Sequence, residues 1–525
     1  MRRRDALRVS LVSVVVALGS VAAALPADAA GGGTPGAEGV GDRLFPQLGN
    51  GGFDVQHYDL ALKYDRVPSP SSSLVTMTAT GTVTITARAT QDLSRFDLDY
   101  SGNPGNLGPL TVNGTPARWV QSREDLVITP SRPIARGNTF RIVSEFKATS
   151  TPPGGAAAKE TAFFGTAEGT ATAGQPDGMH FMYPSSDHPS DKATFTFRLD
   201  VPSADTAVAN GVLANKRVTG PRTLWTFEER DPMATELTQI AVGAYTVIPR
   251  GAVAGVTLRD VVPTKLVAKY RNLLDVERRQ MRWMVDRVGP YPFPVYGSLV
   301  VEQDLGFALE TQTISLFDTP WFDLPEGVWS PTMTHELAHQ WFGDSVAPQV
   351  WSDIWQNEGH ATWYEVTWAE ENGQLPDDVG VPELDTVEKL MRVLYSLGDQ
   401  YRSDFGPVAK PRSGSLEDLF SPQSYYGGAL VLYALRQKVG PVAFAQIERT
   451  WAQRLRGRSA GTDEFIATAS AVSRRDLRPF LCAWLYDLKT PPMPGHPDWT
   501  VDPVGDGAAE AATLAARSVD PHRRR

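Results

Sequence analysis

Hydrophobic and polar residues alternate along much of the first half of the chain. Short runs rich in Val, Thr and Phe, at residues 74–79, 82–87 and 194–200, are separated by stretches containing Pro, Gly, Asn and Asp. A period of two between turn-forming residues is typical of β-strands with one buried face. We therefore predict an N-terminal antiparallel, sandwich-like β domain over residues 51–248.

The pattern changes to a helical period after about residue 265. Apolar residues recur three to four positions apart in residues 265–274 and again in residues 443–451. A mainly helical domain is predicted over residues 249–498, which makes the chain a multidomain α+β protein. The final residues, 499–525, are rich in Ala, Gly and charged side chains, and we expect a disordered tail there.

The N-terminus has the composition of an export signal. Arginines occupy residues 2–4, an apolar run covers residues 11–25, and Ala-Asp-Ala follows at residues 27–29. A membrane-spanning helix needs about 20 apolar residues, so we interpret residues 1–29 as a cleaved signal peptide. We expect a secreted protein without a membrane span after cleavage, exported by the Sec route or, given the paired arginines, the twin-arginine route. The Gly-rich residues 30–50 are predicted to be a linker.

Charge and cysteine content narrow the functional classes. The formal net charge of −10 argues against nucleic-acid binding, which usually requires a basic face. Cys482 is the single cysteine, so no intramolecular disulfide can form, and stability must come from a large core. It lies in an apolar run, and we assign it no chemistry.

One motif in the helical half predicts a metal site. His335 and His339 flank Glu336 in the sequence His-Glu-Leu-Ala-His. Two histidines four residues apart on a helix point the same way and can bind one Zn²⁺ ion, while Glu336 diverges by about 100° and can act on a water at the metal. Ser330 is predicted to cap this helix and Pro331 to occupy its first position.

A catalytic zinc site needs a third protein ligand. The metzincin pattern requires Gly and His three and six residues after the second histidine, where this chain has Phe342 and Ser345. The gluzincin pattern requires a glutamate on a following helix, and Glu358 follows after 18 intervening residues. Asn357 is predicted to cap a helix running to about residue 371, with Glu358 in its first turn as the third ligand rather than as a partner of the helix dipole alone.

These segments resemble the aminopeptidase N family of zinc metallopeptidases. The resemblance rests on HELAHQWFGD and on WSDIWQNEGHATWYE at residues 351–365, and it continues in residues 183–196, 209–213 and 242–245. It covers roughly residues 50 to 490. It implies a β domain followed by a thermolysin-like catalytic domain, with one Zn²⁺ ion and hydrolysis of the N-terminal peptide bond of peptides.

The resemblance also implies roles for further residues. Glu310, in a segment similar to the family's GxMEN motif, corresponds to the glutamate that holds the substrate's free amine. Tyr425 corresponds to the tyrosine that donates a hydrogen bond to the oxyanion, and Glu336 to the general base. Gln175 is a further candidate for the amine subsite, whereas His360 is expected to pack rather than to bind metal.

Two other functional classes remain open at this point. An endopeptidase would keep the metal and the base but would not need Glu310. A catalytically silent binding protein could share the fold, although the complete set of metal ligands and catalytic residues disfavours it. The expected substrates are peptides with a free N-terminus.

Overall fold

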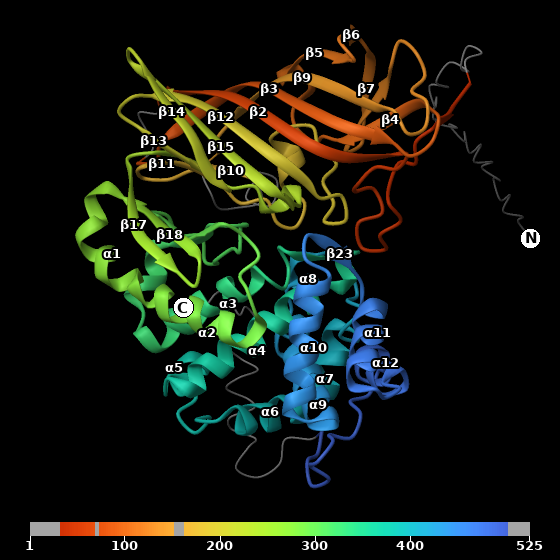
Figure 1. The fold of residues 1–525 in the computed structure, drawn as a ribbon, viewed down its shortest axis with the longest axis vertical. Helices are drawn as coiled ribbons and strands as arrows, with labels where there is room; N and C mark the ends of the chain where they lie inside the picture. The colour runs from red at the N-terminus through yellow and green to blue at the C-terminus, as the bar shows by residue number, and fades with distance from the viewer. Residues whose placement is uncertain (1–31, 69–72, 152–161, 502–525) are drawn as a thin grey trace, which may run out of the picture.

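The chain folds into a β-rich N-terminal part and a mainly helical C-terminal part that pack against each other (Figure 1). The computed structural model describes residues 32–68, 73–151 and 162–501. The α+β class and the order of the two parts confirm the prediction. The predicted signal peptide, residues 1–29, lies outside the described residues.

The largest sheet of the β-rich part has eight strands in the order β14-β15-β12-β2-β3-β9-β5-β6. These strands are β14 (Val212–Thr219), β15 (Arg222–Met233), β12 (Ala193–Pro202), β2 (Phe53–Val67), β3 (Thr76–Ala89), β9 (Thr139–Thr149), β5 (Leu107–Val112) and β6 (Thr115–Pro116). Buried and exposed residues alternate along β2 and β9, so one face of the sheet lies on the core. All pairings are antiparallel except β2 with β12, which is parallel.

Two four-stranded sheets complete this part of the molecule. One contains β1 (Thr34–Pro35), β4 (Leu93–Asp99), β8 (Asp125–Thr129) and β7 (Arg118–Ser122); the other contains β10 (Phe163–Gly165), β11 (Gly169–Thr172), β16 (Ile240–Gly243) and β13 (Thr206–Ala209). Short helical turns η1 (Pro104–Asn106), η3 (Met179–Phe181) and η4 (Thr235–Leu237) connect them. One hydrophobic cluster, which includes Tyr58, Phe96 and Val242, joins residues of all three sheets.

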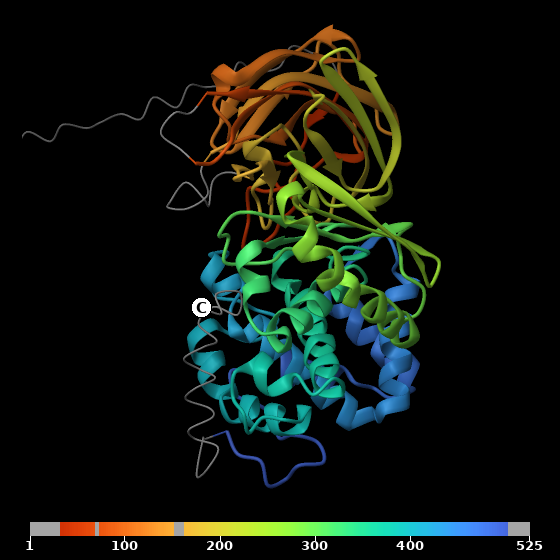
Figure 2. The same ribbon diagram turned by 90° about the vertical axis from the view of Figure 1, so that its left-hand side faces the viewer.

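A five-stranded sheet forms the junction with the helical part (Figure 2). Its strands are β17 (Tyr245–Val253), β18 (Val256–Pro263), β19 (Val295–Tyr296), β20 (Ser298–Val301) and β21 (Ser315–Asp318). The helices η5 (Thr264–Leu266), α1 (Val267–Leu273), η6 (Leu274–Val276) and α2 (Glu277–Val288) lie between β18 and β19 in the chain. The predicted division between residues 248 and 249 falls inside β17, because the hairpin of β17 and β18 already belongs to this sheet.

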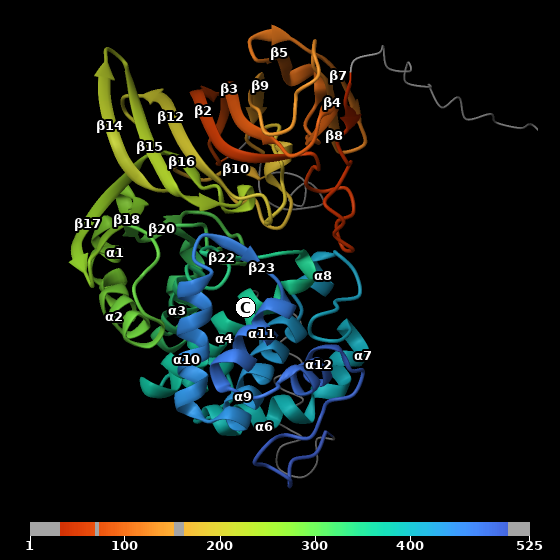
Figure 3. The same cartoon turned by 45° about the vertical axis from the view of Figure 1, so that its right-hand side comes forward.

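Helices make up most of the remaining chain. They are η7 (Thr319–Asp323), α3 (Glu326–His339), η8 (Trp351–Asp353), α4 (Trp355–Glu371), α5 (Leu375–Val379), α6 (Val387–Ser396), α7 (Gly398–Phe405), α8 (Leu416–Leu419), the π-helical turn η9 (Gln423–Gly427), α9 (Gly428–Val439), α10 (Pro441–Arg454), α11 (Thr462–Ser473) and α12 (Arg478–Tyr486). Two strands, β22 (Val346–Pro348) and β23 (Arg458–Ala460), pair at the end that faces the β-rich part (Figure 3). The largest hydrophobic cluster of the helical part includes residues of α3, α4 and α9.

Both helices that carry the predicted metal ligands begin earlier than predicted. Helix α3 begins at Glu326, so Ser330 does not cap it and Pro331 lies inside it. Helix α4 begins at Trp355, so Asn357 lies inside its first turn rather than capping it, whereas the predicted end near residue 371 is confirmed. Local capping preferences are overridden here because nearly every residue of both helices is buried.

Two segments predicted to lack structure are packed where the structure describes them. Within the predicted linker of residues 30–50, residues Asp42 and Leu48 are each only 1% exposed. Within the predicted tail, Trp499 is buried and its ring stacks on Tyr433 at 5.9 Å, while residues 502–525 lie outside the described residues. Aromatic and hydrogen-bonding side chains in these Gly-rich or Ala-rich stretches supply the contacts that composition alone does not reveal.

Among the described residues, no helix is both long and apolar enough to span a membrane. Cys482 on α12 is half-buried against the main helical core, consistent with a packing role.

Candidate active site

Helices α3 and α4 bring the three predicted metal ligands together. His335 and His339 lie one turn apart on α3, and Glu358 lies in the first turn of α4. The Nε2 atoms of His335 and His339 are 3.3 Å and 3.4 Å from the same oxygen, Oε2 of Glu358. One ligand atom from each residue lies within 4.8 Å of the others, and all three side chains are buried.

The second ring nitrogen of each histidine, Nδ1, has a hydrogen-bond partner of its own. Nδ1 of His335 lies 2.9 Å from Oε2 of Glu365, and Nδ1 of His339 lies 3.1 Å from the main-chain oxygen of Phe342. A carbonyl oxygen can only accept, so His339 carries a proton on Nδ1 and donates it to Phe342. Such outer hydrogen bonds fix the ring orientation of metal-binding histidines.

The electrostatics of this cluster favour a cation between the ligands. Although burial lowers it, hydrogen bonds that His335 donates to Glu358 and Glu365 raise the pKa of His335 to about 9. Although burial raises it, the charge of His339 and hydrogen bonds from both histidines hold the pKa of Glu358 well below its usual range. Two nitrogen atoms and one carboxylate oxygen converging in a buried place are the donor set of a catalytic Zn²⁺ site, so the residues present fit that ion.

Glu336 lies beside this cluster but is not one of the three converging ligands. It is 1% exposed, and neither carboxylate oxygen has a hydrogen-bond partner among the described residues. Burial raises the pKa of Glu336 to about 8. A buried carboxylate without a structural partner, next to a metal triad, has the properties of a general base.

Tyr425 covers the cluster from the π-helical turn η9. Its ring lies 5.7 Å from the His335 ring in a nearly parallel orientation. Burial and the charges of nearby carboxylates, led by Glu358, raise the pKa of Tyr425 well above its usual value, so the phenol stays protonated and can donate. A Cβ atom on Gly427 would lie 2.4 Å from Oε1 of Gln423, so a larger residue there would require the Gln423 side chain to move.

Glu310 lies in a loop between β20 and β21 and is 4% exposed. Nε2 of Gln175 donates to Oε1 of Glu310 at 2.7 Å, so the two candidate amine-subsite residues are in contact. Nε2 of Gln340, the residue after α3, donates to the main-chain oxygen of Glu310 at 2.9 Å. Thr313 has a positive φ of 69°, and its N–H donates to Oε1 of Gln340 at 2.9 Å.

The β-rich part also holds this loop. Nδ2 of Asn210 donates to the main-chain oxygen of Gln312 at 2.7 Å, and the N–H of Gly211 donates to Oγ1 of Thr313 at 2.8 Å. Both residues lie between β13 and β14, far from the loop in sequence. The conformation of the Glu310 loop therefore depends on residues from both parts of the molecule.

Sequence reasoning missed Glu365 and Gln340. Glu365 lies seven residues, or about two turns, after Glu358, so helical periodicity could have placed both on one face of α4. Gln340 directly follows the metal motif, but no local pattern indicates its contact with a loop 30 residues away. His360 packs with its ring stacked on Phe342 at 4.4 Å, as expected.

Comparison with known families matches two sequence models to the chain. The peptidase family M1 domain matches residues 275–484, and the peptidase M1 N-terminal domain matches residues 54–237. A crystal structure of an M1 zinc metallopeptidase from Deinococcus radiodurans is 30% identical, with a TM-score of 0.71, and the match covers 87% of this chain and 99% of that one.

The chain belongs to peptidase family M1. The resemblance to the aminopeptidase N family is thereby confirmed. Family M1 membership, the zinc metallopeptidase neighbours and the converging triad support one catalytic Zn²⁺ ion.

Curated relatives in family M1 are longer than the aligned region. Aminopeptidase M1-D of Oryza sativa subsp. japonica is 25% identical over 58% of this chain and 35% of its own length. Aminopeptidase N of Streptomyces lividans is 26% identical over 59% of this chain and 37% of its own length. The chain thus spans little more than a third of the length of these relatives, whereas it spans nearly all of the Deinococcus peptidase.

Proposed function

We propose that this family M1 protein is an exported zinc aminopeptidase that removes the N-terminal residue from peptides. The observation that carries the proposal is the buried Glu310 carboxylate beside the metal triad. Its charge acts on His339, Glu336 and Tyr425, and Gln175 hydrogen-bonds to it. A carboxylate that faces a metal site from one side is suited to hold a cationic α-amine.

His335, His339 and Glu358 would hold the ion, which supplies Lewis-acid chemistry and lowers the pKa of a water in the site. Glu336 removes a proton from the attacking water and passes it to the leaving nitrogen. Tyr425 donates its phenolic hydrogen to the oxygen of the scissile carbonyl as negative charge develops there. Glu310 and Gln175 hold the free amine, so the first peptide bond is the one placed beside Glu336.

Ligands of solved relatives support this substrate class. A mutant of the Deinococcus radiodurans peptidase has been solved bound to a Tyr-Ser-Ala substrate, and a mutant of a two-domain M1 zinc metallopeptidase has been solved bound to L-arginine. Both ligands carry a free α-amine. The arginines at residues 2–4 and the apolar run at residues 11–25 support export of the chain.

Matched peptides with free and acetylated N-termini test the proposal, with and without a chelator. The protein starting at residue 30 should cleave the free-amine peptide far faster than the acetylated one, and the chelator should abolish cleavage. Cleavage of both peptides at similar rates would retain a metallopeptidase but replace the aminopeptidase with an endopeptidase. Cleavage of neither would favour a binding protein of the same fold.

A further inference from the structure

Residues 36–50, here called the N-terminal strap, cross from the β-rich part to the helical part. The strap follows β1, which pairs with β4 of the β-rich part. Nε2 of Gln91 donates to Oγ1 of Thr34 and to the main-chain oxygen of Pro35, at 3.0 Å and 2.9 Å. These contacts fix the beginning of the strap to the β-rich part alone.

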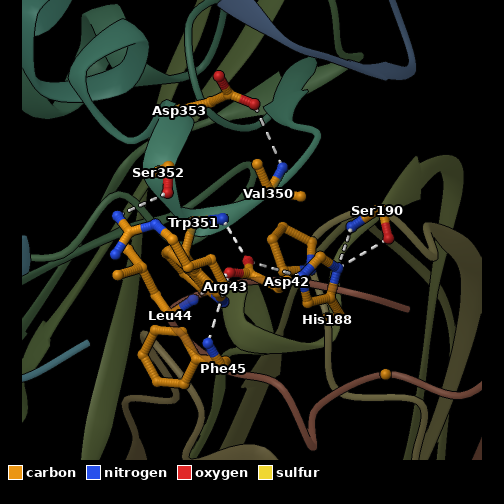
Figure 4. A network of polar contacts seen from close by, with 12 residues as sticks. Asp42, Arg43, Leu44, Phe45, His188, Ser190, Val350, Trp351, Ser352 and Asp353 are labelled. Atoms are coloured by element: carbon orange, nitrogen blue, oxygen red, sulfur yellow. Dashed lines mark hydrogen bonds and ion pairs between the residues drawn. The ribbon is translucent and has the colours of Figure 1, made fainter. Parts of the chain in front are cut away.

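Asp42, in the middle of the strap, joins both parts of the molecule (Figure 4). Its Oδ2 accepts from the N–H of Trp351 at 2.6 Å and from Nε2 of His188 at 3.2 Å. The N–H of Ser190 donates to Nδ1 of His188, so the proton of that imidazole lies on Nε2, facing Asp42. Oδ1 accepts from the N–H of Leu44 at 2.7 Å.

The contact with Trp351 supplies a missing helix cap. Trp351 begins η8, which leads after one residue into α4, the helix of Glu358. The first N–H groups of a helical segment have no partner within it, and Val350 has no side-chain acceptor to offer. Asp42 provides that acceptor from a position 309 residues away, and its negative charge suits the positive end of the helix dipole.

Apolar contacts extend the strap toward the second catalytic element. The Phe45 ring lies 5.7 Å from the Trp351 ring, and Leu44 and Phe45 pack against the cluster of Trp351, Ile354 and Leu419. The main-chain oxygen of Leu419 accepts from Oγ of Ser424, which directly precedes Tyr425. The strap therefore packs against Trp351 and Ile354, which precede Glu358 by seven and four residues, and against Leu419, whose main chain holds the neighbour of Tyr425.

Hydrogen bonds from Arg43 fix the strap from the side of α8. Nη2 of Arg43 donates to the main-chain oxygen of Pro411 at 2.7 Å and contacts Oγ of Ser352 at 3.3 Å. A Cβ atom on Gly414 would lie 2.8 Å from the main-chain oxygen of Leu44 and 3.1 Å from the Phe45 ring. The loop before α8 is thus shaped to receive the strap.

We propose that residues 42–45 of the strap are positioning residues for the metal ligand Glu358 and for Tyr425. Part of the segment predicted to be a linker, residues 30–50, would then position catalytic residues. This inference rests on the proposed function for its effect on turnover, but its effect on metal binding stands independently.

The test compares Asp42→Asn with Gln91→Ala in the zinc-loaded protein. Asn keeps the shape of Asp42 but loses the charge and presents either a donor or a weaker acceptor to Trp351. Gln91→Ala removes strap contacts to the β-rich part only and serves as the matched control. Two measurements are made: the rate of zinc release to a chromogenic chelator, and kcat and KM for a free-amine peptide.

Asp42→Asn should accelerate zinc release and lower kcat, each about tenfold, the lower end of the range for outer partners of metal ligands. KM should change less than about twofold, and Gln91→Ala should match the wild type. Wild-type zinc release and kcat in Asp42→Asn would overturn the proposal, as would equal changes in Gln91→Ala. If Asp42→Asn does not fold, Phe45→Leu is measured in its place, with the same split between zinc release and KM expected.

A protein that binds zinc but cleaves no peptide would contradict the proposed function alone. The zinc-release rates would then still decide the role of the strap.

Discussion

Replacing Glu310 with glutamine separates binding of the substrate amine from the metal chemistry. Glutamine has the shape of glutamate, so the contact with Gln175 and the main-chain bond from Gln340 can persist. The substrate's ammonium group would instead meet a neutral amide in a place where Glu310 is only 4% exposed. Removing one partner of a buried ion pair costs about 3 to 5 kcal/mol, because the remaining charge is left without compensation.

We expect a loss of about 3 to 4 kcal/mol in transition-state binding, which corresponds to about a 10²- to 10³-fold lower kcat/KM for free-amine peptides. The assay measures kcat/KM for peptide pairs that differ only by N-terminal acetylation, in the wild type and in Glu310→Gln. Acetylated peptides carry no ammonium group, so their slow cleavage should be nearly unchanged. Zinc content and melting temperature should match the wild type.

Two results would refute the reasoning behind Glu310→Gln. A loss of less than about tenfold for the free-amine peptide would mean that the carboxylate does not pair with the amine. An equal loss for both members of the pair would mean that the substitution damages the metal site or the fold rather than amine recognition.

Three further predictions follow from individual contacts. Glu365→Gln replaces the carboxylate that holds the first histidine ligand and should weaken zinc affinity about 10- to 100-fold, as measured by competition with a chelator. Gln340→Met removes the hydrogen bond to the backbone of Glu310 and should raise KM for free-amine peptides about tenfold, with acetylated peptides little affected. Although burial lowers it, the hydrogen bond that His180 donates to Asp187 raises the pKa of His180 to about 9. The wild type should therefore exceed His180→Asn in unfolding free energy by up to about 3 kcal/mol below pH 6.5.

The difference in unfolding free energy between the wild type and His180→Asn should decrease as the pH rises. A pKa raised from 6.5 to about 9 in the folded state stabilises the fold fully below pH 6.5, and that contribution disappears as the pH rises through 9. A difference between wild type and variant that grows from pH 6.5 to pH 9 would contradict it. Unchanged zinc affinity in Glu365→Gln would contradict the prediction for Glu365. Equal changes in KM for free-amine and acetylated peptides in Gln340→Met would contradict the prediction for Gln340.

The metal triad could be predicted because its geometry is local. Two histidines one turn apart converge on any straight helix, and the distance in sequence to Glu358 matches a helix that packs beside the first. Glu365 was within reach of the same argument, since a residue two turns after Glu358 lies on the same face. Periodicity likewise separated the β-rich half from the helical half, because one buried face per element sets the spacing of apolar residues.

The helix starts and the strap could not be predicted from local patterns. Asn357 has the chemistry of a cap but lies inside α4, and the first N–H of the preceding turn η8 is bound by Asp42, over 300 residues away in sequence. Pro331 is tolerated inside α3, where neighbouring elements bury the helix on all sides. The Gly-rich composition of residues 30–50 is typical of linkers, and only a few side chains, Phe45 among them, distinguish the strap from one.

The two family domains are not structurally independent at the candidate active site. Asn210 of the β-rich part donates to the backbone of the Glu310 loop, so the conformation of that loop is settled by a side chain encoded a hundred positions earlier. A catalytic half produced alone would carry every atom of the metal triad and still lack the hydrogen bonds from Asn210 and Gly211 that hold the Glu310 loop. Exchanging N-terminal domains between relatives would therefore also change how the Glu310 loop is held, and with it the placement of the substrate. Substrate specificity would then depend on the pair of domains rather than on the catalytic domain alone.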